Sequence, residues 1–269
     1  MPDAQTEMGA QGLFGDAYVD GLEITCAQCS SSAGPTYVRW GRVECPADSV
    51  LRYAGRAAGN FGSQGGSGSN LVCLHPAPYY KEWDGRENPG SARLFNVEYE
   101  TRLKGISEWH KLQSHDVPCA VCQATGSMAV HMQPGSINCP AGWAKDYSGF
   151  VMSEGTQATH ALEYLCVDEK AEAHPNSSPD KDLRAARLVP VEIKIAADTS
   201  NEVPGYTPNT ELSCAVCVKP MPITLEKVTI ESSNRIVKYG GTPGDRIKLS
   251  FTSSRSIEKP SVVCSSPPR

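Results

Sequence analysis

The sequence lacks the features that would mark a membrane-spanning, nucleic-acid-binding or largely helical protein. It contains no run of about 18 apolar residues, the length that a transmembrane helix requires. A formal net charge of −5 gives no basic surface for nucleic acid or for an anionic membrane. Aromatic residues make up only 7% of the chain, whereas glycine and proline number 24 and 20. This composition predicts an all-β protein, with short strands joined by many turns.

Signatures of enzymes are also missing. There is no His-Glu-x-x-His helix and no Gly-x-Ser-x-Gly elbow, and no activated nucleophile accompanies the scattered histidines. His131 lies on a predicted strand and is interpreted as a packed or surface residue. The glycine-rich stretch 59–70 has no readable strand before it or helix after it, so it indicates a hairpin loop rather than a phosphate-binding loop. We therefore expect no catalysis, no cofactor and no metal.

The N-terminal residues lack the basic and apolar regions of a signal peptide. Eleven cysteines at regular spacing nevertheless favour an oxidising, extracellular setting. Together these observations suggest a fragment of a longer secreted protein. The triplet Asn176-Ser177-Ser178 lies in a loop rich in proline and serine, which makes Asn176 a candidate for glycosylation.

The cysteines that are present fall on a repeating pattern. Three Cys-x-x-Cys pairs begin at Cys26, Cys119 and Cys214, and their offsets are 119−26 = 93 and 214−119 = 95. Two Cys-Pro cysteines and two further single cysteines follow the same spacing; they are Cys45 and Cys139 (139−45 = 94), and Cys73 and Cys166 (166−73 = 93). The motif Tyr53-x-Gly55 recurs as Tyr147-x-Gly149. The spacing indicates a tandem duplication.

Four segments follow from this pattern. They are a loosely ordered lead-in (1–25), repeat one (26–118), repeat two (119–219) and a C-terminal segment (220–269). Strands are expected at 36–40, 50–53, 71–74, 94–100, 128–132, 150–152 and 191–195, those at 94–100 and 191–195 with the alternation of half-buried strands. Three further strand pieces, at 228–231, 246–251 and 261–264, resemble the opening strands of an immunoglobulin-like sandwich. The segment is about half the length that such a sandwich needs, so we expect an incomplete immunoglobulin-like β segment.

Three interpretations of the Cys-x-x-Cys pairs compete. A redox pair requires a helix that begins at the first cysteine, and the residues after Cys29 and Cys122 are poor helix formers. A zinc ribbon separates its two pairs by about 15–20 residues, far less than the spacing here. Structural disulfides are favoured, because each repeat supplies two single cysteines and one closing pair, which together make two bridges. Their connectivity stays open at this point.

Several of these motifs, taken together, resemble a known family. Tyr37-Val38-Arg39-Trp40-Gly41-Arg42, Cys45-Pro46 and Asn70-Leu71-Val72-Cys73-Leu74 are similar to the globular domain of short-chain, spongin-type collagens. Repeat two resembles the centre of the non-collagenous C-terminal domain of type IV collagen, through Cys119-Ala-Val-Cys122, Met128-Ala-Val-His131, Cys139-Pro140-x-Gly142-Trp143 and Gly149-Phe150-Val151-Met152. The resemblance covers residues 26–219.

The resemblance implies a tandem pair of homologous, disulfide-stapled β subdomains. It also implies self-association as a trimer, or association with other matrix proteins. The charge and the lack of a long apolar run, and not the resemblance, predict that the chain binds no nucleic acid and does not insert into a membrane. Transferred position by position, the bridges would be Cys45–Cys122, Cys73–Cys119, Cys139–Cys217 and Cys166–Cys214. Cys26 and Cys29 would remain outside the two modules, where they would either close an earlier repeat or pair with each other. Cys264 has no partner in the pattern. No Gly-X-Y tract is present, so the chain has no triple helix of its own.

Three functions are therefore weighed. The first is a secreted structural or oligomerisation module of the extracellular matrix. The second is an adhesion or carbohydrate-binding module that uses the loops at 59–70, 76–90 and 168–182. Its tryptophans could form a sugar platform, but Trp40 and Trp143 adjoin the Cys-Pro elements and are expected to pack near the disulfides. The third is a cytosolic zinc protein.

Overall fold

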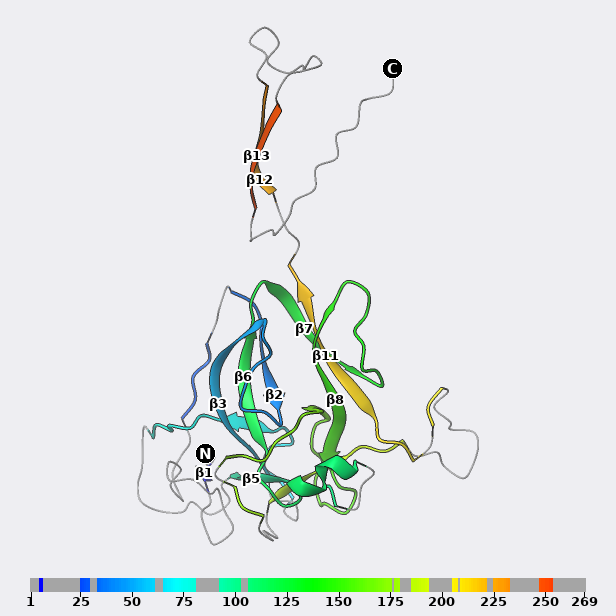
Figure 1. The fold of residues 1–269 in the computed structure, drawn as a ribbon. Helices are drawn as coiled ribbons and strands as arrows, with labels where there is room; N and C mark the ends of the chain where they lie inside the picture. The colour runs from blue at the N-terminus through cyan, green and yellow to red at the C-terminus, as the bar shows by residue number, and fades with distance from the viewer. Residues whose placement is uncertain are drawn as a thin grey trace. The chain divides into compact units, whose positions relative to one another are not determined.

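The computed structural model divides the chain into two compact units, Met1–Pro220 and Met221–Arg269. It describes residues 5–6, 25–29, 33–60, 65–80, 92–102, 106–175, 177–179, 185–193, 205–207, 209–221, 225–232 and 247–253. Strands form nearly all of the regular structure in these ranges, and their one helical element is the short 3-10 helix η1, Ser107–Leu112 (Figure 1). The predicted all-β class is confirmed.

The described part of the first unit contains eleven strands, which belong to one hydrogen-bonded sheet. In chain order they are β1 (Gln5–Thr6), β2 (Thr36–Trp40), β3 (Ser49–Gly59), β4 (Val72–Leu74), β5 (Arg93–Tyr99), β6 (Pro118–Ala124), β7 (Ser127–Pro134), β8 (Ala144–Glu154), β9 (Leu165–Asp168), β10 (Ala186–Pro190) and β11 (Ser213–Pro220). In the second unit, β12 (Leu225–Ser232) pairs antiparallel with β13 (Ile247–Ser253).

The sheet of the first unit closes on itself. Its strands follow the order β5, β10, β8, β9, β2, β6 and β3, and the β3–β5 pairing completes the circle. Most neighbours are antiparallel, but β5–β10 and β2–β9 are parallel. Closure leaves few free edges, which limits unwanted pairing with other chains. The strands outside the circle are β1 on β5, β4 on β3, and β11, which links β8 to β7.

The two repeats build their strands in the same way. The eleven-residue strand β3 pairs with β4, β5 and β6, and the eleven-residue strand β8 pairs with β9, β10 and β11. Even the register irregularity recurs. It falls between Leu51 and Tyr53 in β3, and between Lys145 and Tyr147 in β8, at an offset of 145−51 = 94. The repeated text of the sequence is therefore matched by repeated strand pairing.

The repeats nevertheless share their largest core. Its buried residues include Trp40 and Val97 from repeat one, and Val167 and Leu188 from repeat two. Burial of this apolar surface is the main stabilising contribution, at about 25 cal/mol per Å². Because side chains from both repeats fill one interior, we expect the first unit to unfold as a whole.

Two sequence expectations differ from the structure. Strand β5 lies between β3 and β10, so it is buried continuously from Phe95 to Tyr99, including the polar Asn96 and Glu98, instead of being half-buried. The alternating stretch 191–195 is not a strand where it is described. The strand is β10, Ala186–Pro190, and Glu192 makes only an isolated bridge to Glu211.

Several expectations concern residues that lie outside the described ranges. These are most of the lead-in, the third strand piece of the C-terminal segment at 261–264, and Cys264. The first strand piece falls within β12, and residues 247–251 of the second fall within β13. The immunoglobulin-like assignment of this segment stays a prediction.

Candidate functional site

Four disulfides staple the first unit, two in each repeat. They are Cys45–Cys122, Cys73–Cys119, Cys139–Cys217 and Cys166–Cys214, with Cα–Cα distances of 5.7, 5.8, 5.7 and 5.8 Å. These are the four pairs that the family resemblance implies. The four bridges use eight of the eleven cysteines, so these eight are not zinc ligands. Disulfides of this density are typical of secreted or extracellular proteins.

Each Cys-x-x-Cys pair that closes a repeat lies on a central strand. Strand β6 runs between β2 and β3, and β11 runs between β7 and β8. Residues three apart on a strand point to opposite faces of the sheet. Cys119 therefore reaches the cysteine of β4 on one face, while Cys122 reaches the Cys-Pro cysteine on the other. The closing strand is fixed from both sides.

The Tyr-x-Gly motif explains how the short strand of each repeat is held. The Tyr53 hydroxyl donates to the Cys73 carbonyl at 2.9 Å, and the Tyr147 hydroxyl donates to the Cys166 carbonyl at 3.0 Å. A Cβ at Gly55 would lie 1.9 Å from the Leu74 carbonyl oxygen. At Gly149 it would lie 1.8 Å from the equivalent oxygen of Val167. Glycine is required at both positions because another strand passes too close for any side chain.

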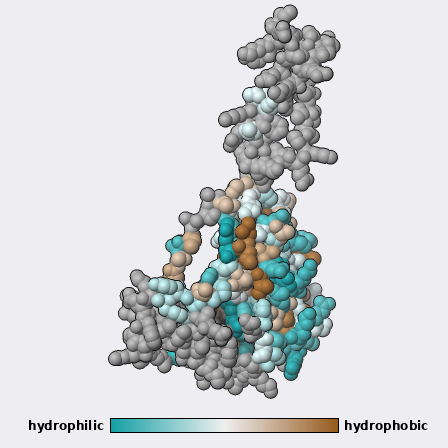
Figure 2. All heavy atoms as spheres, turned by 60° about the vertical axis from the view of Figure 1, so that its left-hand side comes forward, coloured by the Kyte–Doolittle hydropathy of each residue, from teal (hydrophilic) through white to brown (hydrophobic). Residues whose placement is uncertain are grey.

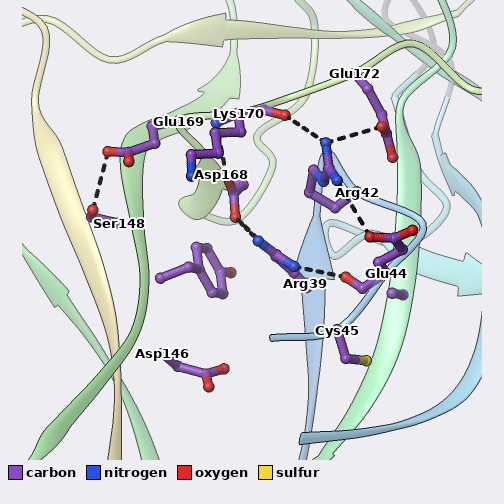
Figure 3. A network of polar contacts seen from close by, with 12 residues as sticks. Arg39, Arg42, Glu44, Cys45, Asp146, Ser148, Asp168, Glu169, Lys170 and Glu172 are labelled. Carbon is purple, nitrogen blue, oxygen red and sulfur yellow. Dashed lines mark hydrogen bonds and ion pairs between the residues drawn. The ribbon is translucent and has the colours of Figure 1, made fainter. Parts of the chain in front are cut away.

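A polar network joins repeat one to repeat two where β2 meets β9 (Figure 3). The Arg39 guanidinium donates to Asp168 Oδ2 from Nε at 2.8 Å and from Nη2 at 2.5 Å, and its Nη1 donates to the Glu44 carbonyl at 2.9 Å. The Lys170 amide donates to Asp168 Oδ1 at 2.8 Å. The side chains of Arg39 and Asp168 are only 13% and 2% exposed. Such a buried pair holds its two strands in one geometry, because each charge needs its partner.

A second ion pair extends the network toward the surface. Arg42 Nη1 lies 3.0 Å from Glu172 Oε2, and the Val43 amide donates to Glu172 Oε1 at 3.0 Å. The Glu172 amide in turn donates to the Gly41 carbonyl at 2.9 Å. The end of β2 is thus tied to the turn after β9 by both backbone and side chains. Because Arg42 and Glu172 are partly exposed, this pair stabilises less than the buried one.

The hydroxyl of Tyr37 donates to Asp146, across the same contact between the repeats. Burial raises the pKa of Asp146, although this hydrogen bond and the nearby Arg39 charge oppose the effect. Burial also raises the pKa of Tyr37, and the Asp146 carboxyl adds to the rise. The Arg39 guanidinium lies 5.5 Å from the centre of the Tyr147 ring, a cation–π geometry. The network therefore connects and orients side chains of both repeats.

Other residues singled out from the sequence are dispersed. Asn176 lies outside the described ranges, although its neighbour Ser177 accepts a hydrogen bond from the Asp116 amide at 2.8 Å. Trp40 is buried in the core with Cys119, as expected, whereas Trp143 is half-buried beside Lys219. Trp109 is buried in the same core as Trp40, so these two side chains do not form an exposed sugar platform.

No group of three or more His, Cys, Asp or Glu residues within the described ranges could hold a metal ion. Eight of the eleven cysteines are oxidised, as described above. The described ranges contain no helix of the length and apolar character that a membrane crossing requires.

Two titratable groups outside the network have strongly shifted pKa values. Burial raises the pKa of Glu154 to about 7, although the amide of Arg187 donates to its carboxylate. Burial, together with the charge of Arg56, lowers the pKa of His174 to about 4. Arg56 itself pairs with Asp116 at 2.6 Å and lies 3.2 Å from His174 Nδ1.

These shifts oppose each other in the pH dependence of stability. Glu154 binds a proton more tightly in the folded chain, so its contribution falls as pH rises from about 4.5 to about 7. His174 binds a proton less tightly in the folded chain, so stability falls as pH drops from about 6.5 to about 4.

We expect Glu154→Gln to raise the free energy of unfolding at pH 8 by roughly 1 kcal/mol, after allowance for partial exposure.

Urea unfolding at several pH values checks this expectation. Glu154→Gln should reveal a loss of stability on acidification, and His174→Gln should reveal a loss on the alkaline side of the same range. Parallel profiles for the two variants and the unmodified chain would contradict the assignment.

Sequence reasoning missed the network between the repeats, because Arg39 and Asp168 are 168−39 = 129 positions apart and no local pattern connects them. The only available signal was the repeat itself, in which these two positions carry different residues in the two copies.

A scan of the chain against models of known protein families finds no match.

Proposed function

We propose that the chain is a non-enzymatic structural module of the extracellular matrix, which associates with copies of itself as the globular domain of short-chain collagens does. The disulfides support an oxidising compartment. The observation that carries the proposal is that the contact between the two repeats is made by strands that are not equivalent to each other.

Repeat one contributes β2 to this contact and repeat two contributes β9, with Trp40 opposite Val167. The strands that correspond to them are β7 in repeat two and β4 in repeat one. Among the described residues, β7 pairs only with β11, and β4 pairs only with β3. Each repeat carries a version of both surfaces, so a contact that uses one surface from each repeat leaves the other surface of each repeat unused. Further chains can bind at these unused surfaces until a ring closes. Since no described strand pairs with the outer edges of β7 and β4, we propose that these edges receive a second chain.

The side chains at these two edges differ from those of the contact inside the chain. Gln133 pairs with Ala215 as Arg39 pairs with Ala120, so Gln133 stands in the place of Arg39. His75 follows Cys73 by two residues, as Asp168 follows Cys166, so His75 stands in the place of Asp168. Contact between copies would thus bring Gln133 to His75 instead of forming a buried ion pair. Association between chains is expected to be weaker than the contact within one chain.

Apolar side chains on the surface also favour association. Val50 and Leu51, at the start of β3, are 43% and 45% exposed, and Met128, at the start of β7, is 57% exposed. Figure 2 shows a short apolar strip bordered by hydrophilic residues on one face of the first unit. Exposed apolar patches of this kind commonly mark protein contacts.

Sedimentation velocity over a range of protein concentrations tests the proposal. We expect a concentration-dependent oligomer, with three copies as its final size. A monomer at every concentration up to about 100 µM would contradict self-association at the weak end of protein affinities, and would favour the adhesion alternative.

The edge residues offer a sharper test. The double variant Gln133→Arg/His75→Asp would recreate the Arg39–Asp168 pair between copies, so it should strengthen association about tenfold or more, at about 1.4 kcal/mol per tenfold. Each single variant places one unmatched charge at the edge and should weaken association. The control is the unfolding free energy of the dilute protein, which should change little because both positions are partly or fully exposed. Independent effects of the two substitutions would exclude this pair of edges.

A further inference from the structure

Cys26 and Cys29 form no disulfide, and both are exposed. They precede Cys119 and Cys122 by 93 positions, and so stand in the repeat pattern as a third Cys-x-x-Cys pair. The assembly function proposed above does not use them. All other cysteines of the described ranges already have partners.

The two equivalent pairs show what such a segment does. In each case the first cysteine bonds the cysteine of a short strand, and the second bonds a Cys-Pro cysteine. The strand that carries each Cys-x-x-Cys pair is central, with one neighbouring strand on either side. Ala27 corresponds to Ala120 and Ala215, which are both fully buried in these central strands. In contrast, residues 25–29 are outside any strand, and Ala27 is exposed.

The order of segments along the chain agrees with this equivalence. Strand β6 closes repeat one, and after a two-residue turn the chain begins β7, the first strand of repeat two. Strands β6 and β7 do not pair with each other: β6 pairs with β2 and β3 of repeat one, and β7 pairs with β11 of repeat two. Residues 25–29 likewise precede β2, the first strand of repeat one. They therefore occupy the position of a closing strand whose own sheet is not formed by the described residues.

We propose that residues 25–29 act as a donor strand that completes an unfinished module of the same kind on another polypeptide. The partner is defined by its chemistry. It carries a Cys-Pro cysteine and, 27 or 28 residues later, a cysteine on a short strand, as in 166−139 = 27 and 73−45 = 28. Cys26 bonds the short-strand cysteine and Cys29 bonds the Cys-Pro cysteine. This contact goes beyond the self-association proposed above and does not involve the β4 or β7 edges.

Each bridge forms by thiol–disulfide exchange. Two thiols lose two protons and two electrons, and a disulfide oxidant such as oxidised glutathione takes them up and becomes two thiols. The backbone of residues 25–29 would at the same time gain hydrogen bonds on both edges, the general mode of strand addition to an open sheet.

The first experiment uses the full chain and a ¹⁵N-labelled probe polypeptide of residues 33–117, which carries Cys45 and Cys73 but lacks strand β6. After incubation in a glutathione redox buffer, we expect a covalent one-to-one adduct. Peptide mapping should join Cys26 of the chain to labelled Cys73, and Cys29 to labelled Cys45. The full chain with Cys26→Ser and Cys29→Ser is the matched control and should form no adduct.

A second experiment removes the need for the probe to fold alone. Residues 33–117 are fused directly before residues 25–269, so that the added Val117 stands two positions before Cys26, as Val117 stands before Cys119 in the chain. We expect no free thiol at Cys26 or Cys29 and the same two bridges. Scrambled adducts in the first experiment, or a Cys26–Cys29 bond in the fusion, would overturn the proposal.

Discussion

Replacement of Cys139 and Cys217 by alanine should lower the free energy of unfolding of the first unit by up to about 4.5 kcal/mol. The bridge joins residues 78 positions apart, and closure of a loop of this length restrains the unfolded chain by about that amount in the chain-entropy model. Measured losses for native disulfides span about 2–5 kcal/mol, so the expected effect is a large part of the stability of an ordinary domain. The measurement is chemical denaturation, monitored by tryptophan fluorescence and circular dichroism.

The chain supplies its own controls for this experiment. The equivalent bridge of repeat one, Cys45–Cys122, spans 77 positions and should cost the same when it is removed. Replacement of the exposed Cys26 and Cys29 by serine should cost nothing in the isolated chain. A shift for one bridge and none for its equivalent would mean that strain or packing, and not loop closure, determines the effect.

The same variants show whether the repeats fold independently. Because the largest core contains side chains of both repeats, loss of either bridge should shift one cooperative transition. Two transitions, of which only one moves, would show that the repeats are separate folding units and would contradict the shared core.

The disulfide pattern could be predicted because equivalent cysteines of the two repeats are separated by a nearly constant number of residues. Cysteines at a constant offset need no knowledge of the fold, and the family resemblance then selects one connectivity among several. The strands that carry the closing pairs were not predicted. Cys-Ala-Val-Cys shows no alternation of apolar and polar residues, because β6 and β11 are central strands buried on both faces.

The prediction that β5 is half-buried was wrong for the opposite reason. Its sequence alternates, which normally indicates one exposed face, yet Asn96 and Glu98 are only 1% and 4% exposed. Closure of the sheet places β5 between strands of both repeats, and no local pattern announces a closure between segments so distant in sequence. Strand β10 was misplaced for a similar reason. Its position is determined by pairing with β5 and β8, and the alternation at 191–195 is a weaker influence.

Substitution of Asp168 by alanine should destabilise the first unit by about 3–5 kcal/mol. Its carboxylate is the charged partner of Arg39, and removal of one member of a buried pair leaves the other charge without compensation. Among the described residues, the guanidinium would keep the Glu44 carbonyl, the face of the Tyr147 ring and the charge of the nearby Asp146 carboxyl. The same denaturation experiment measures the loss.

The Arg42–Glu172 pair of the same network is the matched control. Its side chains are 23% and 34% exposed, so Glu172→Gln should cost less than about 1 kcal/mol, since the amide keeps an acceptor oxygen for the Val43 amide. If Asp168→Ala cost no more than Glu172→Gln, the contact between β2 and β9 would not depend on its buried charges.

The double variant Arg39→Met/Asp168→Leu separates stability from specificity. Apolar residues of similar size often replace a buried ion pair without loss, so the double variant should be far more stable than Asp168→Ala alone. If the pair serves to fix the register of β2 against β9, the double variant should keep its stability but lose the single geometry of the contact between repeats. Hydrogen exchange at the amides of Val43 and Glu172 reports on that geometry, because both donate hydrogen bonds across the contact to acceptors that the double variant keeps. Unchanged protection at these two amides would show that packing alone positions the two repeats.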